Sequence, residues 1–305
     1  MDIYLPVAGV SENVLLLLAL GGGIGFLSGL FGVGGGFLLT PLLIMMGIPP
    51  AVAVGSGANQ VLGASVSGTL AHWRRGTVDV RMGVILLAGG LVGSTLGVWL
   101  FAWLKALGQI ELVINLCYVL LLGTIGGLMM LESLSVLLRR GGGRTVRRKL
   151  HSHPLLHRLP GKMRFPRSRL YISAIPPLVI GVGVGLLSAI MGVGGGFVMV
   201  PAMIYLLQMP TQVVIGTSLF QIVFVTANVT FMQATTNQAV DVVLSVMLLF
   251  GGVVGAQVGS GLGRRLGADQ MRFLLALMVL AMGVKMAVDL MVTPEDAFSL
   301  ASAAS

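Results

Sequence analysis

One stretch of this sequence occurs twice, and it constrains the fold more than any other feature. The first copy runs from Gly25 to Pro41 and reads Gly-Phe-Leu-Ser-Gly-Leu-Phe-Gly-Val-Gly-Gly-Gly-Phe-Leu-Leu-Thr-Pro. The second runs from Gly185 to Pro201 and reads Gly-Leu-Leu-Ser-Ala-Ile-Met-Gly-Val-Gly-Gly-Gly-Phe-Val-Met-Val-Pro. The chain therefore contains two copies of one unit, and each copy has a run of glycines inside an apolar segment.

The composition places both copies in a membrane. Hydrophobic residues make up 56% of the chain and charged residues only 10%, whereas soluble domains carry about 25% charged residues. The apolar runs are continuous and do not alternate with polar residues, which favours helices over a barrel. We expect an all-α polytopic membrane protein. The single cysteine, Cys117, excludes an intrachain disulfide and a thiolate metal site, and we expect it to be a packing residue.

Ten apolar segments can be counted, five in each half. They lie near 14–31, 36–47, 51–70, 82–102 and 109–131, and then near 172–190, 196–208, 211–230, 241–260 and 271–292. Most are about 20 residues long, enough to cross a hydrocarbon core of about 30 Å. The second segment of each half begins at the glycine run and reaches only about 18 Å. These short segments are expected to be full or partial crossings, and the sequence leaves open whether they end within the protein or at the lipid surface.

The two halves also correspond outside the glycine runs. The matching blocks are 55–60 with 216–221, 77–79 with 239–241, and 89–93 with 251–255. Because five segments per half is an odd number, the second copy should be inverted relative to the first. We expect a first transmembrane repeat over 1–138, a basic cytoplasmic linker over 139–170, and a second transmembrane repeat over 171–305.

The distribution of charge agrees with an inverted repeat. Eleven of the nineteen Lys and Arg residues fall between Arg139 and Arg169, as expected of a cytoplasmic loop. Loop 71–82 carries three arginines, and its counterpart 231–240 carries no Lys or Arg. This pattern predicts a bacterial inner-membrane protein with both termini in the periplasm. The net charge of +9 then reflects membrane topology, and nucleic acid is not an expected partner.

The basic linker has its own expected partners. Its arginines predict contact with anionic lipid head groups. Three histidines, His151, His153 and His157, lie among them without Cys or carboxylate neighbours, so no metal site is expected.

The glycine runs are the first candidate site. They comprise Gly34, Gly35 and Gly36 in one half and Gly194, Gly195 and Gly196 in the other. A helix that begins after each run would direct free backbone N–H groups into the break, and such groups bind anions. Broken helices at equivalent places in inverted halves are typical of transport sites. The alternative is that each run is only a close helix crossing or a hairpin turn.

Polar residues of the third segment in each half are the second candidate. They are Ser56, Asn59, Gln60, Gly63 and Ser67 in the first half and Thr217, Ser218, Gln221 and Asn228 in the second. They either hydrogen-bond neighbouring helices or contact a polar solute. Asp79 and Asp241 each precede a long apolar run and are expected to be helix N-caps.

Glycines also recur four residues apart in several segments. They are Gly21, Gly25 and Gly29, Gly93 and Gly97, Gly181 and Gly185, and Gly251, Gly255, Gly259 and Gly263. Such faces allow helix backbones to approach closely, so we expect a tightly packed helical bundle.

Together these motifs resemble a known family. The paired Gly-Val-Gly-Gly-Gly-Phe…Pro motifs, each followed by Gly-Ser/Thr…Gln and a later Val-Asp, resemble the TauE/SafE family of bacterial membrane permeases. The resemblance covers nearly the whole chain except the basic linker and the last dozen residues. It implies export of sulfite or transport of a related sulfur-containing oxyanion or organosulfonate. It also assigns the motif positions Gly34–Gly36, Ser56, Gln60, Gly194–Gly196, Thr217, Ser218 and Gln221 to the site.

The sequence thus predicts a secondary transporter of a small anion, without cofactor or catalytic residues. Transport of another small anion or of a cation, and a non-transporting membrane scaffold, are the alternatives. A cation carrier would need acidic residues deep in the bundle, and a membrane enzyme would need an intramembrane His/Asp/Glu cluster. Substrate identity, direction, coupling ion and a possible homo-oligomer are left open by the sequence.

Overall fold

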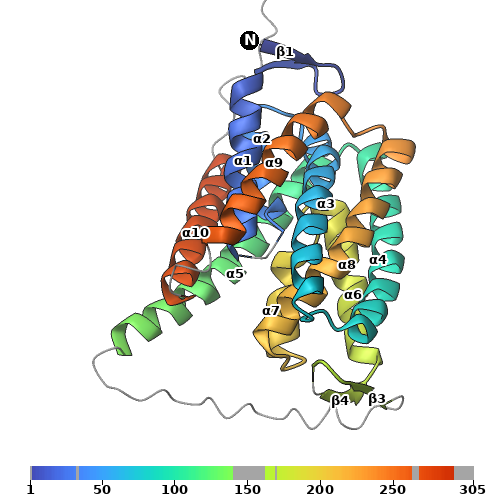
Figure 1. The fold of residues 1–305 in the computed structure, drawn as a ribbon. Helices are drawn as coiled ribbons and strands as arrows, with labels where there is room; N and C mark the ends of the chain where they lie inside the picture. The colour runs from blue at the N-terminus through green and yellow to red at the C-terminus, as the bar shows by residue number, and fades with distance from the viewer. Residues whose placement is uncertain (1, 32–33, 140–161, 169, 263–267, 292–305) are drawn as a thin grey trace, which may run out of the picture. The chain divides into compact units, whose positions relative to one another are not determined.

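The structure is a computed structural model that describes residues 2–31, 34–139, 162–168, 170–262 and 268–291. The first half contains the hairpin β1 (Asp2–Leu5) and β2 (Val10–Asn13), and helices α1 (Val14–Phe31), α2 (Gly36–Met45), α3 (Pro50–Arg74), α4 (Val80–Ala106) and α5 (Ile110–Arg139). The second half contains β3 (Lys162–Phe165), β4 (Leu170–Ser173), α6 (Ile175–Met191), α7 (Gly196–Tyr205), α8 (Thr211–Met232), the π-helix η1 (Gln233–Asn237), α9 (Val242–Leu262) and α10 (Ala268–Met291) (Figure 1).

The prediction of an all-α polytopic membrane protein is confirmed. Every one of the ten expected segments is a helix, and α2 and α7 are the short ones, with ten residues each. Within the described residues, four helices are long and apolar enough to cross a membrane on their own: α4, α5, α8 and α9. The polar residues of α3 lower its hydropathy, although its 25 residues are long enough to cross.

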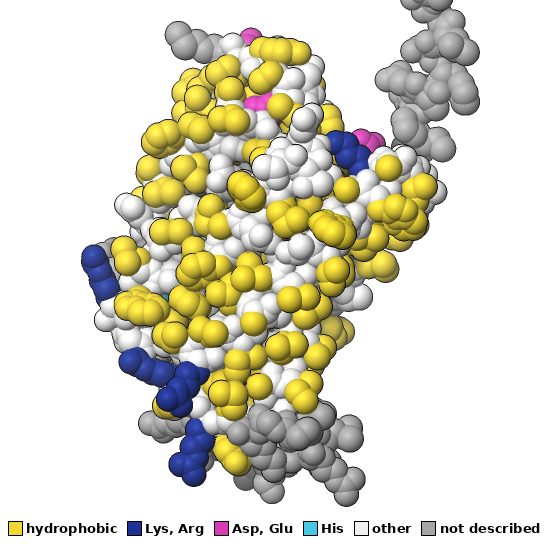
Figure 2. All heavy atoms as spheres, turned by 90° about the vertical axis from the view of Figure 1, so that its right-hand side faces the viewer, with side chains coloured by type: hydrophobic (Ala, Val, Ile, Leu, Met, Phe, Trp, Pro, Cys, Tyr) yellow, Lys and Arg dark blue, Asp and Glu magenta, His cyan; other side chains and the backbone are white. Residues whose placement is uncertain are grey.

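The surface of the helices is apolar, as a lipid environment requires. On α4 the exposed side chains Val92, Leu96, Trp99 and Trp103 follow a helical spacing and form one stripe. Figure 2 shows hydrophobic side chains across the visible face, with most of the visible Lys and Arg side chains toward the lower left. Contiguous exposed apolar surface of this extent marks a membrane-facing protein.

The chain forms two compact units. The first contains residues 1–111 and 143–267, and the second contains 112–142 and 268–305. In the second unit α5 and α10 pack closely, because a Cβ on Gly126 would lie 2.8 Å from Val279 Cγ1. The first unit holds all the candidate site residues.

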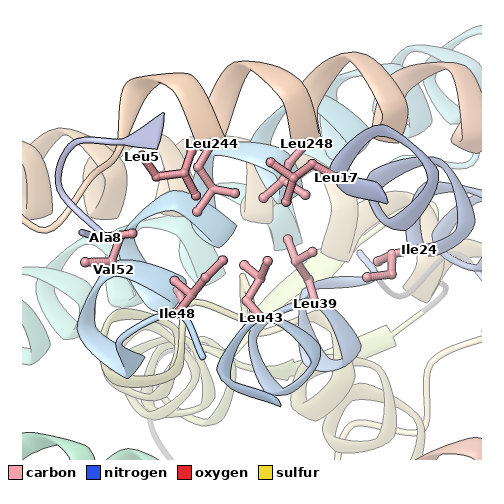
Figure 3. Packing of buried hydrophobic residues seen from close by; sticks show 11 residues of the cluster. Leu5, Ala8, Leu17, Ile24, Leu39, Leu43, Ile48, Val52, Leu244 and Leu248 are labelled. Atoms are coloured by element: carbon pink, nitrogen blue, oxygen red, sulfur yellow. The ribbon is translucent and has the colours of Figure 1, made fainter. Parts of the chain in front are cut away.

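Two of the apolar cores in the first unit are built in the same way. One core contains Leu5, Ile24, Leu39, Leu43, Ile48, Leu244 and Leu248, among others (Figure 3). The other contains Phe165, Val184, Met199, Met203, Met209, Met82 and Leu86, which are the residues at corresponding positions of the other half. Each core therefore combines a hairpin and the first three helices of one half with the fourth helix of the other half.

Close contacts at glycines join α9 to α1 and α4 to α6, so each half is joined to the fourth helix of the other half. A Cβ on Gly25 of α1 would overlap the backbone of Gly252 in α9, and a Cβ on Gly185 of α6 would overlap the backbone of Gly90 in α4. Gly21, Gly29, Gly93 and Gly181 make equivalent approaches. The predicted close packing at these glycines is confirmed, with the α1–α9 and α4–α6 pairs as its sites.

The two hairpins were not expected from the sequence. In β1–β2, Leu5 pairs with Val10, and in β3–β4, Phe165 pairs with Leu170, so the second hairpin repeats the first 160 residues later. They lie at opposite ends of the first unit (Figure 1). Residues 162–165 and 170 of the expected linker belong to this folded hairpin, whereas 140–161, with the three histidines, lie outside the described residues.

Candidate functional site

The two glycine turns lie against each other inside the first unit. Gly34, Gly35, Gly194 and Gly195 all have positive φ angles, between 62° and 91°, which only glycine adopts without strain. A Cβ on Gly36 would lie 2.9 Å from the carbonyl oxygen of Val193 in the other turn. The rings of Phe37 and Phe197 stack with centroids 4.5 Å apart. The fold therefore brings two segments 160 residues apart into one buried cluster.

Each turn opens a short helix. Helix α2 begins after Gly35 and α7 after Gly195, and neither glycine has a side chain to cap the helix. The first turn of a helix leaves N–H groups without intrahelical partners and carries a partial positive charge. Two such helix starts meet here, away from solvent, because Gly34, Gly35, Gly36, Gly194, Gly195 and Gly196 are all buried.

Helices α3 and α8 form the walls of this cluster. A Cβ on Gly34 would lie 3.6 Å from Val61 Cγ1, 3.9 Å from Ile222 Cδ1 and 4.0 Å from Ser65 Oγ. A Cβ on Gly194 would meet Val61, Ile222 and Thr226. The same two helices thus line both turns, and each supplies one apolar and one hydroxyl side chain.

Gln60 and Gln221 are the most informative polar residues of the site. Both are 0% exposed, and neither the amide nitrogen nor the oxygen of either side chain has a hydrogen-bond partner. The Nε2 atom of Gln60 would lie 2.5 Å from a Cβ on Gly252, and that of Gln221 lies equally close to a Cβ on Gly90. Each amide therefore sits where α1 crosses α9 or α4 crosses α6, one residue before Val61 or Ile222.

Burying an amide without partners costs roughly 1–3 kcal/mol. Two fully buried amides at equivalent positions carry this cost twice. A polar ligand bound between the two glutamines would supply the missing hydrogen bonds and offset this cost.

Ser56 and Thr217 have a different role. The backbone N–H of Asp241 donates to Ser56 Oγ at 3.0 Å, and that of Asp79 donates to Thr217 Oγ1 at 3.0 Å. Both aspartates cap the helix that follows, since Met82 N–H donates to Asp79 Oδ1 and Leu244 N–H donates to Asp241 Oδ1. The predicted N-caps are confirmed, and the two hydroxyls join α3 and α8 to them.

The remaining predicted residues are more peripheral. Ser218 Oγ donates to the carbonyl of Ile215 within α8. Asn228 Nδ2 donates to Ser94 Oγ of α4 at 2.9 Å, which is an interhelical bond. Asn59, Gly63 and Ser67 are partly buried.

Several hydroxyls beside the turns were missed in the sequence. Ser28 lies against Gly35, since a Cβ on this glycine would lie 2.8 Å from that of Ser28. Its counterpart Ser188 is buried with an unpartnered Oγ, and so are Ser65 and Thr40. The shared Ser of the two repeated stretches was visible in the sequence, but Ser65 and Thr40 carry no motif of their own.

Charged groups are nearly excluded from the buried part of the described chain. Asp79 and Asp241 are the only Asp, Glu, Lys, Arg or His side chains that are buried among the described residues. No group of three or more His, Cys, Asp or Glu among the described residues could hold a metal ion. Lys285 of α10 is half exposed and pairs with Asp289 at 3.5 Å.

Comparisons with known proteins find relatives named as membrane transporters along most of the chain. The chain is 27% identical over 263 residues to "Probable membrane transporter protein YjnA" of Bacillus subtilis (strain 168), covering 86% of this chain and 95% of that protein. It is 29% identical over 277 residues to a "Probable membrane transporter protein" of Xylella fastidiosa (strain 9a5c), covering 90% and 94%. No solved structure matches. Residues 17–286 match the family described as "Sulfite exporter TauE/SafE", so the chain belongs to this family of membrane transporters.

Proposed function

We propose that this protein is a secondary transporter, and specifically an exporter, of sulfite or a related small sulfur-containing oxyanion or organosulfonate. The observation that carries the proposal is the pair of fully buried, unpartnered amides, Gln60 and Gln221, beside the two glycine turns. The substrate class comes from the family description and from the site chemistry described next.

Neutral donors favour an anion over a cation at this site. Amide and hydroxyl groups and the starts of α2 and α7 can donate hydrogen bonds to oxyanion oxygens. The buried carboxylates Asp79 and Asp241 already accept hydrogen bonds from backbone N–H groups. A cation would need a free carboxylate or a set of carbonyl oxygens in the bundle.

Transport needs access to the site from each side in turn. Because each of the two cores contains a helix from the other half, the bodies that move around the central turns are the two cores and not the two halves of the sequence. We infer that the second repeat is inverted relative to the first and that the anion binds between them. The energy comes from ion or substrate gradients.

The test is sulfite transport by purified protein in proteoliposomes, with Gln60→Leu and Gln221→Leu as the variants. Because both amides lack partners in the fold, leucine should leave thermal stability unchanged or raise it. Transport should fall at least about tenfold, the effect of losing one hydrogen bond to a charged ligand. Asn228→Leu is the contrast, since it breaks the bond to Ser94 and should lower stability.

Three outcomes would count against the proposal. Normal transport by both folded variants would remove the amides from the anion path. Parallel loss of stability and transport would make them packing residues. Absence of sulfite transport by the wild type would overturn the first substrate choice, and the same assay with thiosulfate, alkyl sulfonates and a monovalent cation would identify the class.

A further inference from the structure

Two aspartates connect the hairpins to the candidate site, one at each end of the first unit. Asp241 Oδ2 accepts from the N–H groups of Val7 at 2.9 Å and Ala8 at 3.4 Å, in the turn of β1–β2. Asp79 Oδ2 accepts from Ser168 N–H at 3.0 Å and from Ser168 Oγ at 2.6 Å, in the turn of β3–β4. Ala8 and Ser168 are equivalent positions, so the same contact occurs twice.

Each aspartate residue contacts three elements at once. One oxygen caps α4 or α9, the other oxygen binds the hairpin, and the backbone N–H of the same residue binds Ser56 or Thr217. Ser56 and Thr217 each lie four residues before the site glutamine on the same helix, about one turn away. The hairpin turn, the aspartate and the glutamine thus form one connected series in each half of the cluster.

Both contacts are made in this structure and both are buried. Asp79 is 1% exposed and Asp241 is 0% exposed. Leu5 of β1 and Phe165 of β3 are also buried, each in the core at its own end. The hairpins therefore cover the two ends of the unit while the glutamines are closed off from solvent.

We propose that Asp79 and Asp241 are the gate residues of the transport cycle, each holding one hairpin closed over one side of the site. This inference rests on the proposed transport function. Alternating access requires one contact to open while the other stays closed. The present structure, with both contacts made, corresponds to the occluded state. An Asp→Asn change should bias the protein toward the state open on the side of the changed residue.

Asparagine is a suitable change because it is similar in shape but has one acceptor oxygen. The one amide oxygen of asparagine can accept a hydrogen bond either from the helix or from the hairpin. The NH₂ group then lies against the N–H donor of the other element and cannot accept a bond from it. Asp241→Asn should therefore weaken the β1–β2 contact, and Asp79→Asn should weaken the β3–β4 contact. Asp289→Asn is the matched control, since Asp289 is an exposed carboxylate in the other unit.

The experiment measures access to a reporter cysteine and needs no substrate. Ser65→Cys, in a Cys117→Ser background, places a thiol beside Gly34. Its rate of modification by a small charged thiol reagent is measured in right-side-out and inside-out vesicles. We expect Asp241→Asn to raise this modification rate about tenfold from the β1–β2 side only. Asp79→Asn should raise it by a similar factor from the β3–β4 side only. About tenfold is the effect of losing one hydrogen bond to a charged group.

A smaller change tests the same contact without touching the helix cap. Ser168→Ala removes the hydroxyl bond to Asp79 and should raise modification from the β3–β4 side alone. Equal increases from both sides would mean general loosening and overturn the gate assignment. Unchanged rates in folded Asp79→Asn, Asp241→Asn and Ser168→Ala would also overturn it. Because modification is independent of sulfite, failure of the substrate proposal leaves this test intact.

Discussion

At the scale of single residues, the backbone conformation is shared by the two halves even where the residue type differs. Gly76 has a φ of 67° at the end of α3, and its counterpart Gln238 has a φ of 49° after the π-helix. Gly47 and Gln208 form a second such pair, with φ values of 86° and 57°. A non-glycine residue in this region costs roughly 1–2 kcal/mol.

Gln238→Gly should therefore stabilise the protein. Gln238 is exposed, and relief of the left-handed strain should exceed the entropy cost of glycine, for a net gain of about 0.5–1 kcal/mol. The reverse change, Gly76→Gln, should destabilise by at least as much, because a Cβ there would also lie 2.6 Å from Arg167 Nη1. The measurement is the melting temperature of detergent-purified protein. Equal melting temperatures for Gln238→Gly and wild type would show that the position bears no strain.

At the scale of elements, the helices and the glycine breaks were predictable, but their partners were not. Hydropathy and glycine runs located all ten helices because each helix is encoded by its own residues. The sequence did not predict that α4 packs in the core of the second half and α9 in the core of the first half. Glycine spacing indicates that a helix has a close neighbour but not which helix that neighbour is. The hairpins were also missed, although Pro6 and Pro166 follow Leu5 and Phe165 at the same offset.

The helix crossings provide a matched test at this scale. A Cβ on Gly25 would overlap the α9 backbone, whereas a Cβ on Gly23 of the same helix meets nothing within 4 Å. Gly25→Ala should lower stability by about 1–3 kcal/mol through overpacking. Gly23→Ala should be neutral or stabilising, since alanine favours the helix. The corresponding pair on α6 is Gly185→Ala and Gly183→Ala.

Folded yield and melting temperature in detergent would distinguish the two classes of glycine. If the Gly25→Ala and Gly23→Ala variants have the same melting temperature, the α1–α9 backbone contact is looser than the structure shows. If only the α6 pair behaves as expected, the two halves are not equivalent in packing.

At the scale of the whole molecule, charge and hairpin position together predict orientation. Five exposed arginines lie on or next to the elements around the β3–β4 end: Arg74, Arg75, Arg81, Arg164 and Arg167. Arg167 also donates to the carbonyl of Gly76 at the end of α3. The β1–β2 hairpin instead carries Asp2 and Glu12. The positive-inside rule therefore predicts that β3–β4 lies on the cytoplasmic side and β1–β2 on the periplasmic side.

Cysteines at equivalent hairpin positions test this orientation directly. Ser11 and Tyr171 are exposed and 160 residues apart, in β2 and β4. In a Cys117→Ser background, a membrane-impermeant maleimide should label Ser11→Cys in intact cells and Tyr171→Cys only after permeabilisation. Labelling of both from one side would contradict inverted repeats, because the hairpins would then share a membrane face. Labelling with the sides reversed would keep the inverted repeats but place the arginines outside, against the positive-inside rule. The Asp241 contact would then lie on the cytoplasmic side and the Asp79 contact on the periplasmic side.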